Sequence, residues 1–282
     1  MSLDLLHRFR EYELAVVLPL FPPGSSILEL GAGTGWQARA LAERGFAVEA
    51  IDLKDSAYAS DRVWPIVEYD GRHIPYPDRS FDIVFSSNVL EHVLDVPTLQ
   101  GEIGRVLKPG GRVVHVLPTS AWRAWTNLCH YPHLCRRVIR GLRSWDTTPA
   151  ATSGAAFAWG RFPQCDASRG RLRALTGVLV PTRHGIRGSA VTEMYFFSRF
   201  HWRRVFRETG FVIEREQPAR LFYTAYSLLG DRMSLRLRRA VGCCLGSAGR
   251  VYVLRTMTFD PVAAGSEERL PGGPASRLRR VL

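Results

Sequence analysis

Short apolar runs alternate with stretches of helical spacing over the first 117 residues, and polar turns separate them. After the first run, Ala38, Leu41 and Ala42 recur at the spacing of an amphipathic helix, and Gly45 ends it. Strands that alternate with helices are typical of an α/β protein with a mostly parallel sheet. The predicted strands are residues 27–30, 46–53, 67–71, 81–87 and 112–117, and the predicted helices are 37–44 and 88–107, the second opened by Asn88.

Beyond residue 117 the pattern is interrupted for about 80 residues that contain Trp122, Trp125, Trp145 and Trp159. An insertion after the fifth strand lies at the carboxyl edge of the sheet, where open α/β sheets bind ligands, so it is predicted to be a substrate cap. The strand and helix pattern then resumes with a helix at 198–210 and strands at 211–217 and 250–257. The predicted organisation is a core at 1–117, a cap at 118–197, the end of the core at 198–259 with an insertion at 218–249, and a disordered tail at 260–282.

A glycine-rich turn follows the first predicted strand. The segment ILELGAGTGW places Gly31, Gly33 and Gly35 at alternate positions between that strand and a helix. Glycine adopts φ values that other residues avoid, and a helix N-terminus offers unpaired N–H donors, so a ligand is expected against this main chain. The dinucleotide fingerprint requires a glycine at its sixth position, where Trp36 stands, which disfavours NAD.

The spacing Glu29-x-Gly31-x-Gly33-x-Gly35 resembles the S-adenosylmethionine (SAM) loop of class I methyltransferases. The run FDIVFSSNVLEHVLDVPTLQGEIGRVLKPGGRVVHVLP closely resembles the corresponding part of the small-molecule, ubiquinone-biosynthesis-like group. Segments between His184 and Arg255 loosely resemble methyltransferases of bacterial surface polysaccharide synthesis. The resemblance implies a Rossmann-like fold, namely a mostly parallel seven-stranded sheet with an antiparallel last strand. It also implies SAM as cofactor and S-adenosylhomocysteine as product.

Acidic residues at strand ends complete the predicted cofactor site. Asp52 ends the second strand, where an acidic residue of an α/β sheet accepts hydrogen bonds from ribose hydroxyls. The resemblance places Asp70 beside the adenine amino group and Glu29 near the amino end of the ligand. The predicted cofactor-binding residues are Glu29, Gly31, Gly33, Gly35, Asp52, Asp70, Gly71, Ser87 and Asn88.

The predicted reaction is O-methylation of a hydroxyl on a small or sugar-like acceptor. Acceptors that are linked to a lipid belong to this class. Methyl transfer from a sulfonium requires alignment of donor and acceptor and exclusion of water. The high pKa of a sugar hydroxyl requires a general base, most often His. His184 in the cap is the first candidate, with Glu193 as its orienting partner, and His92 and His115 are the alternatives.

No metal is expected. Ubiquinone-type O-methyltransferases resemble the helix after the fourth strand and hold a divalent cation there with two carboxylates and a histidine. In this chain Asn88, Glu91 and His92 stand at the matching places, so one carboxylate is missing. An amide oxygen can bind a hard cation but supplies no charge.

Charge is distributed unevenly along the chain. Residues 1–117 hold 11 basic and 16 acidic residues, whereas residues 118–282 hold 27 basic and 10 acidic. A basic half suits phosphate, nucleic acid or an anionic membrane. Within the insertion at 218–249, a helix is predicted to pack its apolar face on the domain and to expose Arg232, Arg236 and Arg239. The alternative to a solvated arginine face is that this helix makes peripheral contact with an anionic membrane.

The remaining composition favours a cytoplasmic enzyme, and the resemblance implies a role in bacterial glycan or natural-product biosynthesis. No apolar run has the length of a membrane span, and charged residues interrupt the N-terminal segment, unlike a signal peptide. The five cysteines include no CxxC pair or zinc-like spacing. RNA methylation and a non-catalytic SAM-binding role are the alternatives. Nucleic acid is not expected as a partner, because no RNA-binding module and no motif of amino-group methyltransferases is present.

Overall fold

The computed structural model describes residues 3–143, 180–226 and 232–257. Its centre is one sheet of seven strands in the order β3-β2-β1-β4-β5-β7-β6. Neighbouring strands from β3 to β5 run parallel, and β7 runs antiparallel to both β5 and β6. The predicted fold class is therefore confirmed. The strands are β1 (Ser26–Leu30), β2 (Ala47–Leu53), β3 (Val67–Tyr69), β4 (Phe81–Ser87), β5 (Leu107–Pro118), β6 (Phe211–Pro218) and β7 (Gly249–Thr256).

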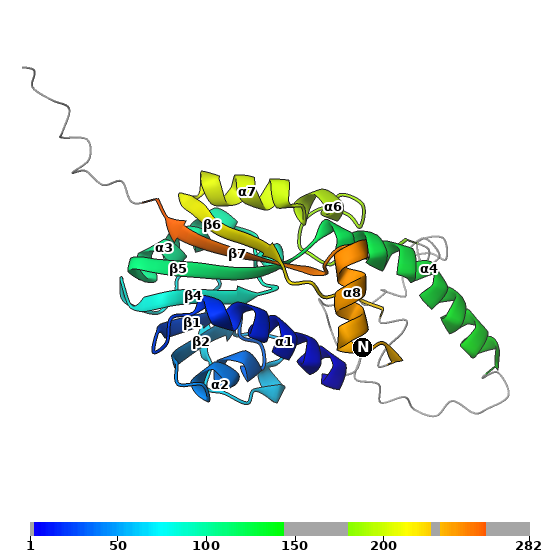
Figure 1. Ribbon diagram of the computed structural model, residues 1–282, viewed down its shortest axis with the longest axis horizontal. Helices are drawn as coiled ribbons and strands as arrows, with labels where there is room; N and C mark the ends of the chain where they lie inside the picture. Colours follow the sequence, from blue (N-terminus) through cyan, green and yellow to red (C-terminus); the bar gives the residue numbers. More distant parts are fainter. Residues whose placement is uncertain (1–2, 144–179, 227–231, 258–282) are drawn as a thin grey trace, which may run out of the picture.

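Helices cover both faces of the sheet (Figure 1). Buried side chains of α3 and α7 share one core with the sheet, and buried side chains of α1 and α2 share a second core on the other face. None of the helices in the described ranges combines the length and the apolarity that a bilayer crossing requires. The helices are α1 (Leu3–Val17), α2 (Trp36–Ala42), α3 (Val96–Val106), α4 (Ser120–Arg143), α6 (Glu193–Phe196), α7 (Arg199–Glu208) and α8 (Leu235–Leu245), and the 3-10 turns are η1 (Leu18–Leu20), η2 (Ala59–Asp61) and η3 (Leu90–His92).

The helix after β4 begins later than predicted. Asn88 has a φ of 56° and leads into the short turn η3, and α3 begins at Val96 with Asp95 as its N-cap. Pro97 explains the shift, because proline lacks an N–H and is tolerated only in the first turn of a helix. Asn88 thus lies in a left-handed turn at the end of β4. Residues 108–111, which separate the predicted helix at 88–107 from the predicted strand at 112–117, are part of β5, next to an irregular register with β4.

The orientation of α8 also differs from the prediction. Arg238 and Gly242 face the domain and are buried, whereas Leu237 and Cys244 are exposed. Arg238 donates to the carbonyl oxygen of Phe222 at 3.1 Å, so its charge is hydrogen-bonded although buried. A Cβ on Gly242 would lie 3.1 Å from the Arg220 main chain, so the helix rests closely on that segment. Leu237 and Cys244, predicted to pack inward, therefore point outward, whereas Arg232, Arg236 and Arg239 are exposed as predicted.

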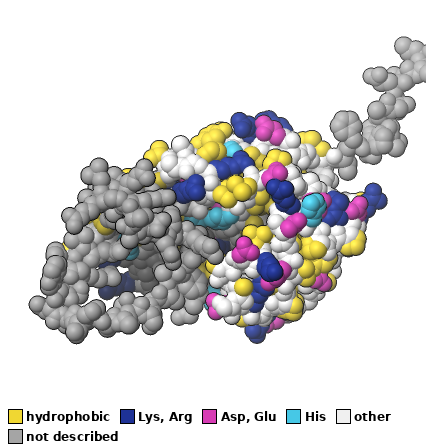
Figure 2. All heavy atoms as spheres, turned by 180° about the vertical axis from the view of Figure 1, so that it is seen from behind, with side chains coloured by type: hydrophobic (Ala, Val, Ile, Leu, Met, Phe, Trp, Pro, Cys, Tyr) yellow, Lys and Arg dark blue, Asp and Glu magenta, His cyan; other side chains and the backbone are white. Residues whose placement is uncertain are grey.

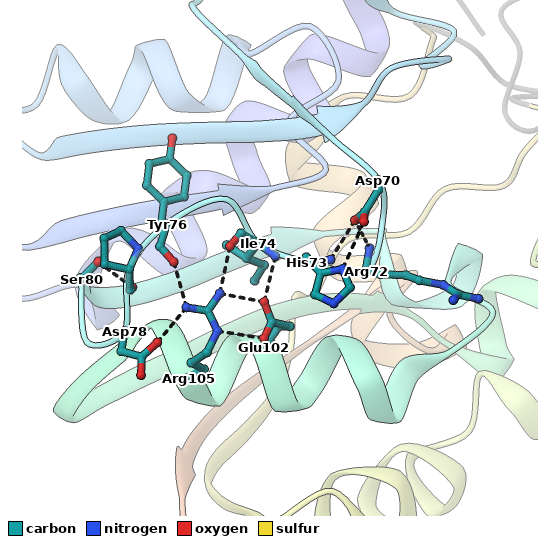
Figure 3. A network of polar contacts seen from close by, with 10 residues as sticks. Asp70, Arg72, His73, Ile74, Tyr76, Asp78, Ser80, Glu102 and Arg105 are labelled. Carbon is teal, nitrogen blue, oxygen red and sulfur yellow. Dashed lines mark hydrogen bonds and ion pairs between the residues drawn. The ribbon is translucent and has the colours of Figure 1, made fainter.

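The loop between β3 and β4 is held to α3 by Arg105 (Figure 3). The Arg105 guanidinium donates to the carbonyl oxygens of Ile74 and Tyr76 and to the carboxylates of Asp78 and Glu102, at 2.7–2.9 Å. Glu102 in turn accepts from the N–H of Ile74 at 3.0 Å. One side chain thus fixes the loop that carries the predicted adenine-binding turn.

Replacing Arg105 with Ala is expected to lower the free energy of unfolding by about 1–2 kcal/mol, because several charge-assisted hydrogen bonds are lost and Glu102 is left without its partner. Arg105→Lys keeps the charge but not the planar fork, so it should recover only part of the loss. Urea denaturation of the two variants measures the effect. Equal stability of wild type and Arg105→Ala would contradict it.

Candidate cofactor and acceptor site

The candidate site lies at the carboxyl edge of the sheet, beside the place where the strand order reverses. From β1 the sheet continues to β2 and β3 on one side and to β4 and β5 on the other. The loops after β1 and β4 therefore diverge, which is where open α/β sheets bind ligands.

The glycine turn after β1 has the strained geometry that its sequence predicts. Gly31, Gly33 and Gly35 have φ values of 68°, 59° and 76°, in the left-handed region that side chains rarely adopt. A Cβ on Gly31 would meet Val89 at 2.5 Å and one on Gly35 would meet Trp64 at 2.6 Å, so close packing within the chain also requires these two glycines. At Gly33 the nearest group is the Tyr58 ring at 3.5 Å, which leaves ordinary contact distance.

Asp52 links the glycine turn to the end of β2. Its Oδ2 accepts from the N–H of Gly33 at 3.0 Å and from the Ser56 hydroxyl at 2.7 Å, and its Oδ1 accepts from the N–H of Leu53 at 2.8 Å. A carboxylate has about four acceptor positions, so about one remains for a ligand hydroxyl in this arrangement. If the Ser56 hydroxyl rotates away from Asp52, a second acceptor position of the carboxylate becomes free for a ligand.

Asp70 lies in an exposed turn at the end of β3. Its Oδ1 accepts from the N–H groups of Arg72 and His73, both at 2.7 Å, and these bonds hold the pKa of Asp70 at about 2 (Figure 3). Gly71 has a φ of 80°, and a Cβ there would lie 3.0 Å from Leu53 at the end of β2. Asp70 therefore shapes this turn, and its contact with adenine stays a prediction.

Glu29 is buried beneath the glycine turn. Its side chain is 2% exposed, and its Oε2 has no hydrogen-bond partner within the described part of the chain. Burial raises the pKa of the carboxyl to about 8, so at neutral pH the proton is largely retained. A ligand ammonium group near Glu29 would favour the ionised form.

An ion-pair network from α1 enters the site, and sequence reasoning missed it. The Arg10 guanidinium lies 2.6 Å from Glu13 and donates to the Ser87 hydroxyl at 3.0 Å. Asn88 donates to the same hydroxyl at 3.0 Å, and the Tyr223 hydroxyl donates to Glu13 at 3.1 Å. Because 210 residues separate Glu13 from Tyr223, no local pattern signals this contact.

His184 lies at the cap side of the site, among aromatic rings. Its ring centroid is 4.7 Å from Trp122, 4.9 Å from His92 and 6.1 Å from Phe197. Burial lowers the pKa of His184 well below its usual value, and His92 and the cations Arg123 and Arg10 add to the effect. The imidazole is therefore neutral near pH 7, the form in which a histidine accepts a proton.

Glu193 positions the His184 segment through the main chain. Its Oε1 accepts from the N–H groups of His184 and Gly185 at 2.7 and 2.6 Å. Its Oε2 lies 3.0 Å from the Arg123 guanidinium, and both side chains are nearly inaccessible to solvent. Burial raises the pKa of Glu193 in spite of that cation. Arg123, on α4, also donates to the carbonyl oxygens of Ala190 and Thr182, so it holds residues 182–190 against α4.

A cluster of three titratable side chains consists of Glu91 and His92, both in η3, and His184. Potential ligand atoms of the three residues lie within 4.8 Å of one another. Burial raises the pKa of Glu91 to about 8 and lowers that of His92 to about 4, so all three groups are mainly uncharged near pH 7. Asn88 takes no part in this cluster and bonds to Ser87. That catalysis needs no metal stays a prediction.

His115 is a structural residue of the sheet. It lies on β5 with no exposed surface, 2.7 Å from the Ser86 hydroxyl and 3.3 Å from the Gln100 amide. Burial lowers its pKa to about 3. His115 is thus enclosed in the core, and His184 and His92 remain as candidate bases.

Comparison with known proteins identifies the family. A family model described as a methyltransferase domain matches residues 5–216. The chain belongs to this methyltransferase family. A chain in the complex between the Haloferax volcanii Trm112 methyltransferase activator and a methyltransferase has the same fold, with a TM-score of 0.51 at 16% identity over 88% of this chain and 91% of that chain.

Curated relatives of this methyltransferase match only part of their own length. A ubiquinone biosynthesis O-methyltransferase of Paramagnetospirillum magneticum is 32% identical over 43% of this chain and 56% of its own. A biotin biosynthesis bifunctional protein of Cellvibrio japonicus is 33% identical over 45% of this chain and 28% of its own. A malonyl-[acyl-carrier protein] O-methyltransferase of Serratia marcescens is 36% identical over 33% of this chain and 38% of its own.

The cofactor of this methyltransferase is SAM, and the residues at the carboxyl edge suit it. The turn at Gly33 has a left-handed φ of 59°, and the buried Glu29 Oε2 has no hydrogen-bond partner among the described residues, a partner that the ligand ammonium would supply. The Arg10 guanidinium, which is paired with Glu13, donates to the Ser87 hydroxyl at the end of β4, so a cation stands at this edge of the sheet. The two charged ends of the amino acid thus have complementary groups.

Proposed function

We propose that this methyltransferase transfers the methyl group of SAM to a hydroxyl of a small or sugar-like acceptor in bacterial glycan or natural-product biosynthesis, in the cytoplasm. The observation that supports it is the placement of a neutral imidazole, His184, on the cap beside the site. Arg10 affects the pKa of both Glu29 and His184, which supports an acceptor site near the cofactor.

In the proposed reaction, bound SAM would supply an electrophilic methyl group, and its S–CH3 bond would break to release S-adenosylhomocysteine. His184 accepts the proton of the acceptor hydroxyl as the oxygen attacks, and the His92 ring lies beside it. Trp122 and Phe197 form apolar walls that exclude water from the reacting groups. Glu193 and Arg123 keep the His184 segment in place.

Calorimetry with SAM tests the cofactor part of the proposal. Asp52→Ala, Arg10→Gln and Gly33→Val are each expected to weaken SAM binding about tenfold or more, because each removes a hydrogen-bonding group or strains the left-handed turn. Arg39→Gln, an exposed change on α2, is the matched control and should bind normally. Unchanged affinity in all three site variants would overturn the placement of SAM.

A further inference from the structure

Two helices at one end of the molecule carry cations without acidic residues. The α4 segment holds five arginines and no Asp or Glu, and residues 232–245 hold four arginines and no Asp or Glu. Arg136 on α4 and Arg232, Arg236 and Arg239 at α8 are exposed. In the described part of the chain, no acidic side chain pairs with Arg232, Arg236 or Arg239.

The sheet region has a different charge pattern. Several of its exposed arginines have acidic partners, such as Arg39 with Glu43 at 2.9 Å and Arg204 with Glu208 at 3.5 Å. Figure 2 shows basic and acidic side chains intermingled over the described part of the sheet region. Among the described residues, the excess of positive charge at Arg232, Arg236 and Arg239 is therefore a local property.

Both helices also expose an apolar stripe. Leu128, Tyr131, Cys135 and Ile139 follow one another at i, i+3, i+7 and i+11 on α4 and are all exposed, Leu128 by 59% and Ile139 by 48%. This spacing places them on one helix face. On α8, Leu237, Ala240 and Cys244 form a similar exposed face, with Leu237 at 50%.

A contact joins the two helices. The Trp125 indole on α4 donates to the carbonyl oxygen of Leu245 at the end of α8, at 3.0 Å. Leu245 is itself 44% exposed, and Leu128 lies one turn beyond Trp125 on α4. Figure 1 shows α8 crossing α4, and α4 projecting beyond the body of the molecule. The exposed faces of α4 and α8 therefore belong to one end of the molecule, which we call the α4–α8 surface.

We propose that the α4–α8 surface binds an anionic membrane, with the aliphatic side chains among the acyl chains and the arginines at the lipid phosphates. Such amphipathic helices bind lipid by apolar burial together with attraction to anionic headgroups. RNA also attracts arginines, but it is bound through aromatic stacking surfaces, whereas these exposed side chains are mostly aliphatic. The proposal rests on the proposed function only in placing a lipid-linked acceptor near the cap.

Vesicle co-sedimentation of the full chain tests the surface without any acceptor. Vesicles of phosphatidylcholine with about a quarter phosphatidylglycerol should bind the protein at low salt, and pure phosphatidylcholine should bind it far less. Binding should fade near 1 M salt, where the Debye length is about 3 Å. The triple variant Arg232→Gln, Arg236→Gln, Arg239→Gln should partition about 100-fold less, and Arg39→Gln, Arg204→Gln, Arg207→Gln is the control of equal charge.

A second variant tests the apolar part. Leu128→Gln with Ile139→Gln and Leu237→Gln should reduce binding at every salt concentration, because it removes apolar area and keeps the charge. No binding to anionic vesicles, equal loss in the control triple variant, or binding of RNA in place of vesicles would overturn the proposal. SAM affinity measured on the same variants should be unchanged, so a failure of the surface is distinguishable from a failure of the cofactor site.

Discussion

Replacing His184 with Ala is expected to lower kcat by about 10²–10⁴-fold, the usual contribution of a positioned general base, with the SAM dissociation constant unchanged. In the proposed reaction the His184 imidazole, held neutral by its lowered pKa, accepts the proton of the acceptor hydroxyl, and the neighbouring His92 is the alternative base. Steady-state kinetics and calorimetry on the same preparation separate the two quantities. If His92→Ala abolished turnover while His184→Ala retained it, the assignment of the base would be wrong.

The pH profile offers a further check on His184. A base whose pKa is lowered stays deprotonated below pH 6.5, so kcat/KM should remain level from pH 7 downward and decline only as the pH falls through the lowered pKa. Treatment with EDTA distinguishes a base from a metal ligand. Survival of activity fits proton transfer by His184, whereas loss that a divalent cation reverses would assign Glu91, His92 and His184 to a metal.

Replacing Glu193 with Ala is expected to lower the free energy of unfolding by about 3–5 kcal/mol, because it leaves the Arg123 charge buried without its counterion. The same change removes the acceptor of two main-chain N–H groups, at His184 and Gly185. Urea denaturation with an unchanged slope measures the loss. The double variant Arg123→Met, Glu193→Gln removes both charges and should recover part of the stability. A loss below about 1 kcal/mol in Glu193→Ala would show that water reaches Arg123.

The central strands could be predicted from the sequence because they are buried on both faces. Such strands occur as short apolar runs, as at residues 81–87, where prediction and structure agree. The site was predictable only where it depends on local chemistry, as in the left-handed glycines and the acidic end of β2. Arg10 was missed because its partner Ser87 is 77 residues away.

The face of α8 could not be predicted for a related reason. Spacing alone assigns an arginine to solvent, yet Arg238 is buried because the carbonyl oxygens of Met233 and Phe222 and the Phe9 ring surround it. Only the folded chain brings these groups together. The start of α3 at Val96, by contrast, could have been predicted from Asp95 followed by Pro97, a combination typical of a helix N-terminus.

The position of β7 between β5 and β6 has a consequence for synthesis on the ribosome. β6 pairs only with β7 within the described sheet, and the pairing partners of β5 and β7 lie far apart in sequence. While residues 249–256 are still inside the exit tunnel, β6 has no neighbour and β5 presents an open edge. Unpaired edges of this kind invite association with other chains. A nascent chain stalled before Gly249 is thus at its most vulnerable to aggregation, although most of its core is already complete.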